Sequence, residues 1–315
     1  MSAIPRRTFL SATAAAVGGL SIGSHGRSIL AAQDTAASAG SGDWPDLIGL
    51  PRGWRSMRKL DAHNHVMQGV HKPDADWSAV ERTVEAAQVL GITKLYCSRP
   101  ITGGVAAPIE TVHDANDSVL AAMKRYPGLI EGYCFVQPGN GRDALDEIDR
   151  CIELGMIGIK LYNQFKYNDP TVFPVAEKCL ELKIPFLGHS AYLADARTKA
   201  AQPRTSNALE FGELALRYPE LLLILGHING GGDWEWAIRA LRDFPSVYLD
   251  TSGSVLEDDT IELCVRELGH RRLLFATDQT MEGGVGKILG AELTAEQRED
   301  IFWKNFQAIL DRRPK

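Results

Sequence analysis

The stretch Asp61-Ala62-His63-Asn64-His65 follows Met57–Leu60 and precedes Val66, and it predicts a strand over residues 57–65. Side chains alternate along a strand, so His63 and His65 are expected to project from the same face. Their two imidazoles would then be placed to bind one metal ion from one side. A lone His-x-His pair also fits two unrelated polar residues, and the rest of the chain has to decide between these interpretations.

Four more residues with metal-binding or acid–base side chains stand at the ends of predicted apolar strands: Lys160, His189, His227 and Asp278. Neutral imidazole nitrogens and carboxylate oxygens are ligands that suit Zn²⁺ or a similar divalent ion. The recurrence of such residues at strand ends favours a metal site over isolated polar residues.

Strand and helix patterns alternate from residue 57 onward. We predict strands at 57–65, 93–97, 129–136, 156–161, 184–188, 221–225, 247–250 and 273–276. We predict helices at 76–90, 112–125, 142–154, 171–182, 207–217, 233–243, 258–268 and 295–311, and an active-site loop at 192–206.

Eight strand–helix pairs predict an α/β fold, a (β/α)8 or TIM barrel, formed by a single domain over residues 40–315. In such a barrel the carboxyl ends of the strands meet at one mouth, where the active site lies. The alternative is an open doubly wound sheet. No Gly-x-Gly-x-x-Gly follows the first strand, which weakens a nucleotide-binding interpretation.

The amino-terminal segment has the pattern of an export signal. Arg6-Arg7-Thr8-Phe9-Leu10 precedes the weakly apolar stretch Ala12–Ile22, a pattern typical of twin-arginine signals. We therefore expect residues 1–39 to form a signal peptide and linker read by the twin-arginine export machinery. The mature protein would then be periplasmic or otherwise exported. An ordinary secretory signal or a chance arginine pair is the alternative.

The overall composition limits the partners of the chain. Its 315 residues carry a formal net charge of −6, and no basic stripe suggests nucleic acid. No apolar run approaches the roughly 20 residues of a membrane span, so none is expected in the mature chain. The five cysteines form no Cys-x-x-Cys pair and are expected to be small buried residues. The sequence leaves the oligomeric state open.

The ordered motifs of the chain are similar to those of a known family. Asp-Ala-His-Asn-His, Gly-Ile-Lys-Leu-Tyr, Leu-Gly-His-Ser, Leu-Gly-His-Ile and Ala-Thr-Asp-Gln together resemble the amidohydrolase superfamily, over residues 57–311. They look most like the amidohydrolase-related (amidohydrolase 2) branch, which holds aminocarboxymuconate-semialdehyde and resorcylate decarboxylases beside lactone hydrolases. The resemblance implies a metal-dependent TIM barrel. It also implies the metal ligands His63, His65, His189 and Asp278, with His227 as a proton-transfer residue or a ligand of a second metal.

Lys160 departs from the decarboxylase-like members and resembles a branch in which this lysine is carboxylated and bridges two metals. Three forms remain open: a carbamate bridge, a neutral lysine that ligates or acts as a base, and an ammonium that pairs with a substrate carboxylate. The centre is therefore expected to hold one ion, most simply Zn²⁺, or two ions bridged by carboxylated Lys160.

Other residues near the strand ends are candidates for binding the substrate. Arg99, just after the second strand, would clamp a substrate carboxylate or form a surface ion pair. Tyr162 and Trp234 are further substrate-binding candidates. Asp250 ends the seventh strand and would either orient a ligand histidine or form a salt bridge at the mouth.

These features favour an exported metal-dependent hydrolase that acts on a small lactone, ester or amide through a metal-activated water. Asp278 would take the proton of the water, and His227 would polarise the carbonyl or protonate the leaving group. The alternative is a metal-dependent decarboxylase of a small unsaturated or aromatic acid, in which His227 gives a proton to carbon. A third interpretation is an inactive barrel that binds a metal or a ligand.

Overall fold

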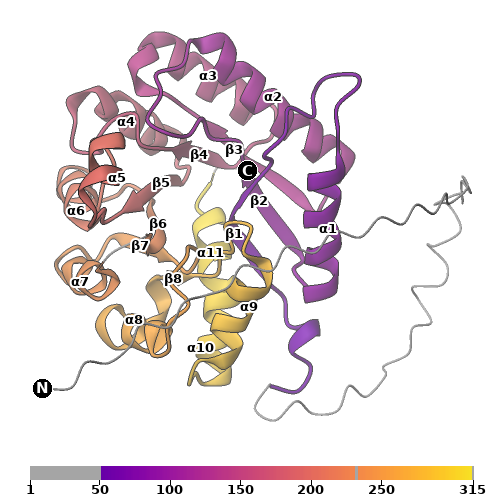
Figure 1. Ribbon diagram of the computed structural model, residues 1–315, viewed down its shortest axis with the longest axis vertical. Coiled ribbons are helices and arrows are strands. Elements are labelled where there is room, and N and C mark those ends of the chain that lie inside the picture. The colour runs from indigo at the N-terminus through magenta and orange to yellow at the C-terminus, as the bar shows by residue number, and fades with distance from the viewer. Residues whose placement is uncertain (1–50, 231–232, 314–315) are drawn as a thin grey trace, which may run out of the picture. The chain divides into compact units, whose positions relative to one another are not determined.

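The computed structural model describes residues 51–230 and 233–313, and within them eight parallel strands form a nearly closed barrel with helices outside it (Figure 1). The strands follow one another in chain order, which confirms the predicted (β/α)8 barrel. Their bounds are β1 Leu60–His65, β2 Lys94–Ser98, β3 Ile130–Phe135, β4 Gly158–Leu161, β5 Phe186–Ala191, β6 Leu223–Gly230, β7 Val247–Asp250 and β8 Leu273–Leu274.

The strands are buried on both faces, as the aliphatic run in β6 illustrates. Ile224 belongs to the cluster of side chains inside the barrel, whereas Leu223 and Leu225 join the cluster shared with the helices. The two ends of the sheet meet where the Ala62 amide of β1 donates to the carbonyl of Phe275, just after β8, at 2.9 Å. This closure brings the ends of β1 and β8 together at the mouth.

Helices connect the strands and cover the outside of the barrel. Each predicted helix has a counterpart among the following: α1 Ser78–Leu90, α2 Ile109–Arg125, α3 Arg142–Glu153, α4 Phe173–Leu182, α5 Ala196–Ala201, α6 Ala208–Arg217, α7 Trp234–Ala240, α8 Thr260–Leu268, α9 Met281–Gly290, α10 Ala295–Glu299 and α11 Asn305–Leu310. Helix α1 shows why the helices could be predicted from the spacing of apolar residues. It buries Val80, Val84 and Ala87 on one face and ends at Gly91, whose φ of 67° suits glycine.

Two helices were not predicted. Helix α9 contains Gly283, Gly284 and Gly286, which lower its intrinsic helix propensity, and it forms because Val285 and Ile288 pack into the core. Helix α5 lies inside the segment 192–206 that was expected to be only a loop, and the Asp195 side chain caps it. The predicted last helix over 295–311 is divided into α10, a π-helical turn over Asp300–Lys304, and α11.

Three further expectations concern the signal peptide, membrane-spanning helices and the cysteines. The predicted signal peptide and linker, residues 1–39, lie outside the described residues. Among the described helices, none is long and apolar enough to cross a membrane. The five cysteines are free and buried, as expected of small core residues.

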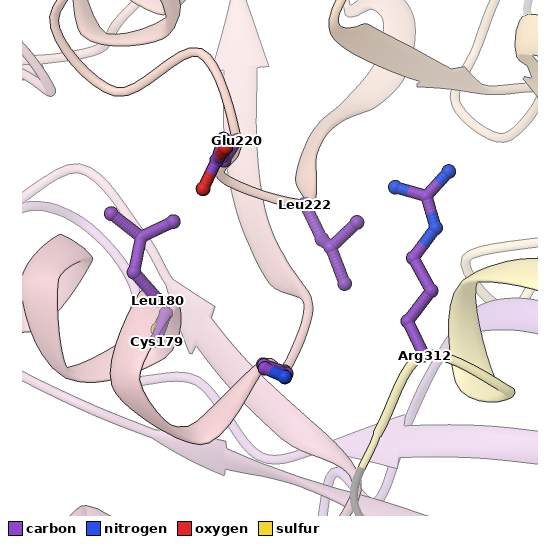
Figure 2. A pocket seen from close by; sticks show the side chains of 6 residues that line it. Cys179, Leu180, Glu220, Leu222 and Arg312 are labelled. Atoms are coloured by element: carbon purple, nitrogen blue, oxygen red, sulfur yellow. The ribbon is translucent and has the colours of Figure 1, made fainter.

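A cavity of about 200 Å³ opens at the amino-terminal end of the strands (Figure 2). Lys183 and Leu222 line it just before β5 and β6, beside Cys179 and Leu180 of α4 and Arg312 near the carboxyl terminus. The predicted site residues stand at the opposite ends of the strands. This cavity is therefore separate from them, at the barrel end that usually serves stability.

Candidate metal centre

The two histidines of β1 reach the same carboxylate. Asp278 Oδ1 lies 2.8 Å from Nε2 of His65 and 3.9 Å from Nε2 of His63. The two rings stand edge to face, with centroids 5.0 Å apart. The ligand atoms of His63, His65 and Asp278 all lie within 4.8 Å of one another. The structure thus brings together the strand pair and the eighth-strand aspartate, as the sequence predicted.

The hydrogen bonds of His65 indicate that this group of side chains fits a cation. Nδ1 of His65 faces the carbonyl of Ser98 at 3.3 Å and its hydroxyl at 3.1 Å. The carbonyl only accepts, so it favours a proton on Nδ1 and leaves a lone pair on Nε2. That lone pair faces the Asp278 carboxylate, and two such electron-rich groups attract a metal ion between them. The donor set therefore suits a divalent metal.

Asp250 holds His63 from behind. Its Oδ2 lies 2.8 Å from Nδ1 of His63, and both side chains are fully buried. Burial alone would raise the pKa of Asp250, but His63 and a hydrogen bond from Ser252 hold that pKa well below its usual range. An ionised Asp250 fixes the proton of His63 on Nδ1 and leaves Nε2 free as a ligand. This is the contact expected of a residue that orients a ligand histidine.

Lys160 points into the same centre from β4. Its Nζ lies 2.6 Å from Nε2 of His63, and no other hydrogen-bond partner of this amine occurs among the described residues. Burial lowers the pKa of Lys160 to about 8, although Asp278 and Asp250 oppose this effect. The lysine is therefore a site residue by position.

His189 and His227 complete the cluster. Nδ1 of His189 lies 2.9 Å from Nε2 of His227. Burial lowers the pKa of His227 to about 4 and that of His189 well below its usual value, so both rings are neutral at pH 7. Tyr162 stacks on the His189 ring with centroids 4.0 Å apart, which places this predicted substrate-binding residue at the centre.

The backbone is strained at two residues of the centre, one inside β6 and one after β8. His227 has φ of 76° and Asp278 has φ of 45°, in a region that residues other than glycine seldom adopt. Gly253 allows close packing there, because a Cβ on it would lie 3.0 Å from Cβ of His227. Such conformations persist where the surroundings impose them, and they concentrate at functional sites.

Sequence reasoning missed the residues that hold the cluster from behind. Asp61 accepts hydrogen bonds from Thr277 through both backbone nitrogen (2.9 Å) and hydroxyl (2.6 Å), which locks β1 to the segment after β8. Ser98 and Ser252 contact the histidines directly. Strand alternation did not indicate Asp61, because its carboxylate bonds to the side chain of Asn64 at 2.8 Å and the register of β1 shifts between Asp61 and Asn64.

The other two predicted substrate-binding residues are Arg99 and Trp234. Arg99 follows Ser98 and lines a cavity of about 350 Å³ with Met67, Ile101 and residues of α2. Trp234 begins α7, where its indole donates to Glu257 at 2.9 Å. Among the described residues, no hydrogen bond or ring contact links Trp234 to the histidines.

Comparisons with known proteins agree with this architecture. A family model described as amidohydrolase matches residues 60–312. The chain is similar to 2,6-dihydroxybenzoate decarboxylase from Rhizobium, with 17% identity, a TM-score of 0.64, and coverage of 81% of this chain and 98% of that one. It is also similar to a dihydroxybenzoic acid decarboxylase from Polaromonas with bound manganese and 2-nitroresorcinol (20%, 0.60, 81% and 97%). A third similar structure is 4-oxalomesaconate hydratase from Rhodopseudomonas palustris (18%, 0.62, 81% and 96%). At these identities the three structures show a shared fold.

Proposed function

Because this chain belongs to the amidohydrolase family, we propose that it is a metal-dependent decarboxylase of a small unsaturated or aromatic carboxylic acid. Two of the three similar structures are decarboxylases of dihydroxybenzoic acids, and the third is a hydratase. These relatives support the decarboxylase alternative better than the hydrolase that the sequence analysis preferred. All of them act in the same fold, with small molecules as their named substrates.

The observation that carries the proposal is two cationic side chains, Arg99 just after β2 and Lys160 in β4, that have no anionic hydrogen-bond partner among the described residues. Arg99 is half-buried, lines the 350 Å³ cavity together with Asp114 and makes no hydrogen bond or ion pair with residues 51–230 and 233–313. Lys160 is fully buried, and its hydrogen-bond partner is an imidazole. Cations in such positions favour an anionic substrate, and a guanidinium pairs well with a carboxylate.

The residues that would hold the metal are His63, His65, His189 and Asp278. A divalent ion bound there would supply positive charge that attracts an anionic substrate and stabilises negative charge formed during the reaction. We propose Zn²⁺ or Mn²⁺, the latter because the Polaromonas relative contains manganese. Imidazole and carboxylate ligands suit both ions.

Decarboxylation needs a proton at the carbon that loses CO₂. When the carbon–carbon bond breaks, its electron pair stays on that carbon, which then takes up one proton. Nδ1 of His227 lies 3.5 Å from Oδ2 of Asp278, so these two side chains form an acid–base pair at the mouth. We assign the proton transfer to His227, which would take up a proton from water and give it to the carbon, while the neighbouring Asp278 carboxylate favours the protonated ring.

Hydrolysis of a small lactone, ester or amide remains a second candidate, which the position of Lys160 favours. Its Nζ lies among the ligand atoms of the centre, 2.6 Å from His63. A carboxylated Lys160 would add anionic oxygens there, and His227 would then be available to a second metal. This candidate requires two metals per chain and a dependence of metal content on bicarbonate.

We also propose that the enzyme is exported. The arginine pair Arg6-Arg7 and the weakly apolar stretch after it support a twin-arginine signal over residues 1–39. Folding before export would let the centre acquire its metal inside the cell. The proposal about localisation is independent of the reaction that the enzyme catalyses.

The reaction can be tested with two substrate panels. The full chain is stripped of metal with a chelator and reloaded with Mn²⁺ or Zn²⁺. The acid panel contains 2,6-dihydroxybenzoate and cis,cis-muconate, both labelled with ¹³C at the carboxyl group. The second panel contains the lactone γ-butyrolactone and the ester phenyl acetate. We expect metal-dependent release of ¹³CO₂ from an acid, absent in the His63→Ala/His65→Ala variant. Opening of the lactone or ester without CO₂ would establish the hydrolase instead. Tight metal binding without turnover on either panel would favour the inactive barrel.

A further inference from the structure

Tyr167 places its hydroxyl near the carboxyl ends of β4 and β5. It lies in the connection that follows β4 and is fully buried. Its Oη lies 3.0 Å from the carbonyl oxygens of Tyr162 and His189 and 3.2 Å from that of Leu161. The hydroxyl has one proton, which these three acceptors share. A single side chain thus connects two neighbouring strands at the mouth of the barrel.

The regular pairing of the two strands stops just before this point. In the parallel register of β4 and β5, Leu161 is the partner of Gly188, and no later pair follows among the described residues. Tyr162 and His189 are the next residues along the two segments. The Tyr167 hydroxyl contacts both of their carbonyls, so it continues the connection where the pairing of the strands ends.

The ring of Tyr167 occupies the space that a side chain at position 188 would need. A Cβ on Gly188 would lie 2.5 Å from Cε2 of Tyr167. Phe186 and Phe211 pack edge to face against the ring, with centroids 5.7 and 4.8 Å away. The Tyr167 amide donates to Oγ of Ser206 at 3.0 Å. The glycine of the Leu-Gly-His-Ser motif therefore makes room for Tyr167, and this packing holds the ring independently of its hydroxyl.

The two residues that Tyr167 connects carry stacked rings. The centroids of Tyr162 and His189 lie 4.0 Å apart, and the ring planes differ by 21°. Both residues are half-buried, so a substrate can reach them. Tyr162 also packs against the apolar cluster that contains Phe135. A change in the separation of the two backbones would move one ring away from the other.

We propose that Tyr167 is a positioning residue that keeps Tyr162 stacked on His189 by connecting their backbones. The stack itself does not depend on the reaction. Only the consequence for substrate binding rests on the proposed function, in which Tyr162 contacts the substrate beside the metal centre. Loss of the hydroxyl should let the two backbones separate, and the substrate should then bind less tightly.

The test is proton NMR of the full chain at pH 7, recorded with Zn²⁺ and without metal. An aromatic ring shifts the protons that lie above its face upfield, so the carbon-bound protons of the His189 ring report the position of Tyr162. A His189→Asn variant assigns these signals by their loss, and Tyr162→Leu gives their position without the stack. We expect Tyr167→Phe to move them toward the Tyr162→Leu position.

A matched control is Tyr133→Phe. Tyr133 is an equally buried tyrosine, in β3, and its hydroxyl has no hydrogen-bond partner among the described residues. This variant should leave the His189 signals unchanged. Wild-type His189 signals that equal those of Tyr162→Leu would overturn the proposal, whether or not Tyr167→Phe folds. Unchanged signals in folded Tyr167→Phe would also overturn it.

Kinetics on the labelled acid that releases ¹³CO₂ give a second readout. We expect Tyr167→Phe to raise KM about fivefold and to leave kcat within about twofold, because the lost hydrogen bond serves substrate binding. A lower kcat with unchanged KM would contradict this role. If the wild type turns over neither panel, the proposed function fails, and the NMR result alone decides whether Tyr167 holds the stack.

Discussion

Nε2 of His63 lies 2.6 Å from Nζ of Lys160, so the buried lysine bonds to the nitrogen that the candidate metal centre would use. The opposite nitrogen of the same ring is held by Asp250 at 2.8 Å. Asp250 therefore fixes one ring nitrogen of His63, while Lys160 and a metal ion would compete for the other. This relationship makes Lys160 the residue whose role most needs an experimental decision.

Replacement of Lys160 by Met should strengthen the binding of a single metal. The substitution keeps an unbranched side chain but removes a positive charge next to the ion, and like charges at such distances repel by more than about 1 kcal/mol. We expect the variant to bind the metal at least about tenfold more tightly than the wild type. The wild type should hold one metal per chain, and bicarbonate should not change that content. Competition with a chelating dye measures the affinity. A loss of metal together with bicarbonate dependence would instead identify the carbamate bridge.

Replacement of Asp250 by Asn should weaken metal binding. The variant removes the negative charge that keeps the His63 proton on Nδ1, and loss of such a supporting carboxylate typically costs about 10–100-fold in metal affinity. The same dye competition measures the change. Asp146→Asn, an exposed change on α3, serves as the control and should bind metal like the wild type. Equal affinities in the Asp250 and Asp146 variants would argue against the orienting role.

The barrel itself was predictable because its signals are local. Strand β6 begins within the aliphatic run 221–225, which lies between Pro219 and Gly226. Helix α1 shows three buried positions at helical spacing before Gly91. Helix α9 was missed because its glycines weaken the local signal and its packing against the core decides the outcome.

The candidate site was predictable in part for a similar reason. His63, His189 and His227 lie in the carboxyl-terminal halves of their strands and Asp278 follows β8, and a parallel barrel brings these parts of the chain to one mouth. The 3.1 Å contact between the Ser252 hydroxyl and Nδ1 of His227 was not predictable, because the two residues stand 25 positions apart in the sequence. The hydrogen bond from the Trp234 indole to Glu257 was not predictable either, because no sequence pattern indicates it, and the role of Trp234 in substrate binding stays a prediction.

The ion pair of Glu147 and Arg150 should make stability depend on pH. Burial alone would raise the pKa of Glu147, but hydrogen bonds from Arg150 and Asn116 outweigh it and lower that pKa. A lowered folded-state pKa means that the stabilisation is complete above the unfolded pKa of about 4.3 and is lost as the pH falls through the folded value. Glu147→Gln should therefore cost about 1.5–3 kcal/mol near pH 7.

Urea unfolding of the wild type and Glu147→Gln at a series of pH values checks this prediction. The difference in unfolding free energy should be largest near neutral pH and should narrow below about pH 4. A difference that stays constant or grows as the pH falls would show that the glutamate contributes by its shape and not by its charge.

Export should depend on the arginine pair at the amino terminus. We expect Arg6→Lys/Arg7→Lys to leave the protein in the cytoplasm, because the twin-arginine machinery reads these two side chains. Cell fractionation with immunodetection measures the distribution. Arg27→Lys changes a nearby arginine outside the pair and should be exported normally. Undiminished periplasmic protein in the double variant would refute the twin-arginine signal.

The account rests above all on a divalent metal held by His63, His65, His189 and Asp278. Elemental analysis of the purified full chain, beside His63→Ala/His65→Ala, tests this most directly. A His113→Ala/His270→Ala variant is the control, because it removes two histidines that bond to Glu147 and Asp300 away from the centre. The account predicts a stoichiometric divalent transition metal in the wild type and the control, and its loss from the His63/His65 variant. Full metal content in that variant would contradict the account.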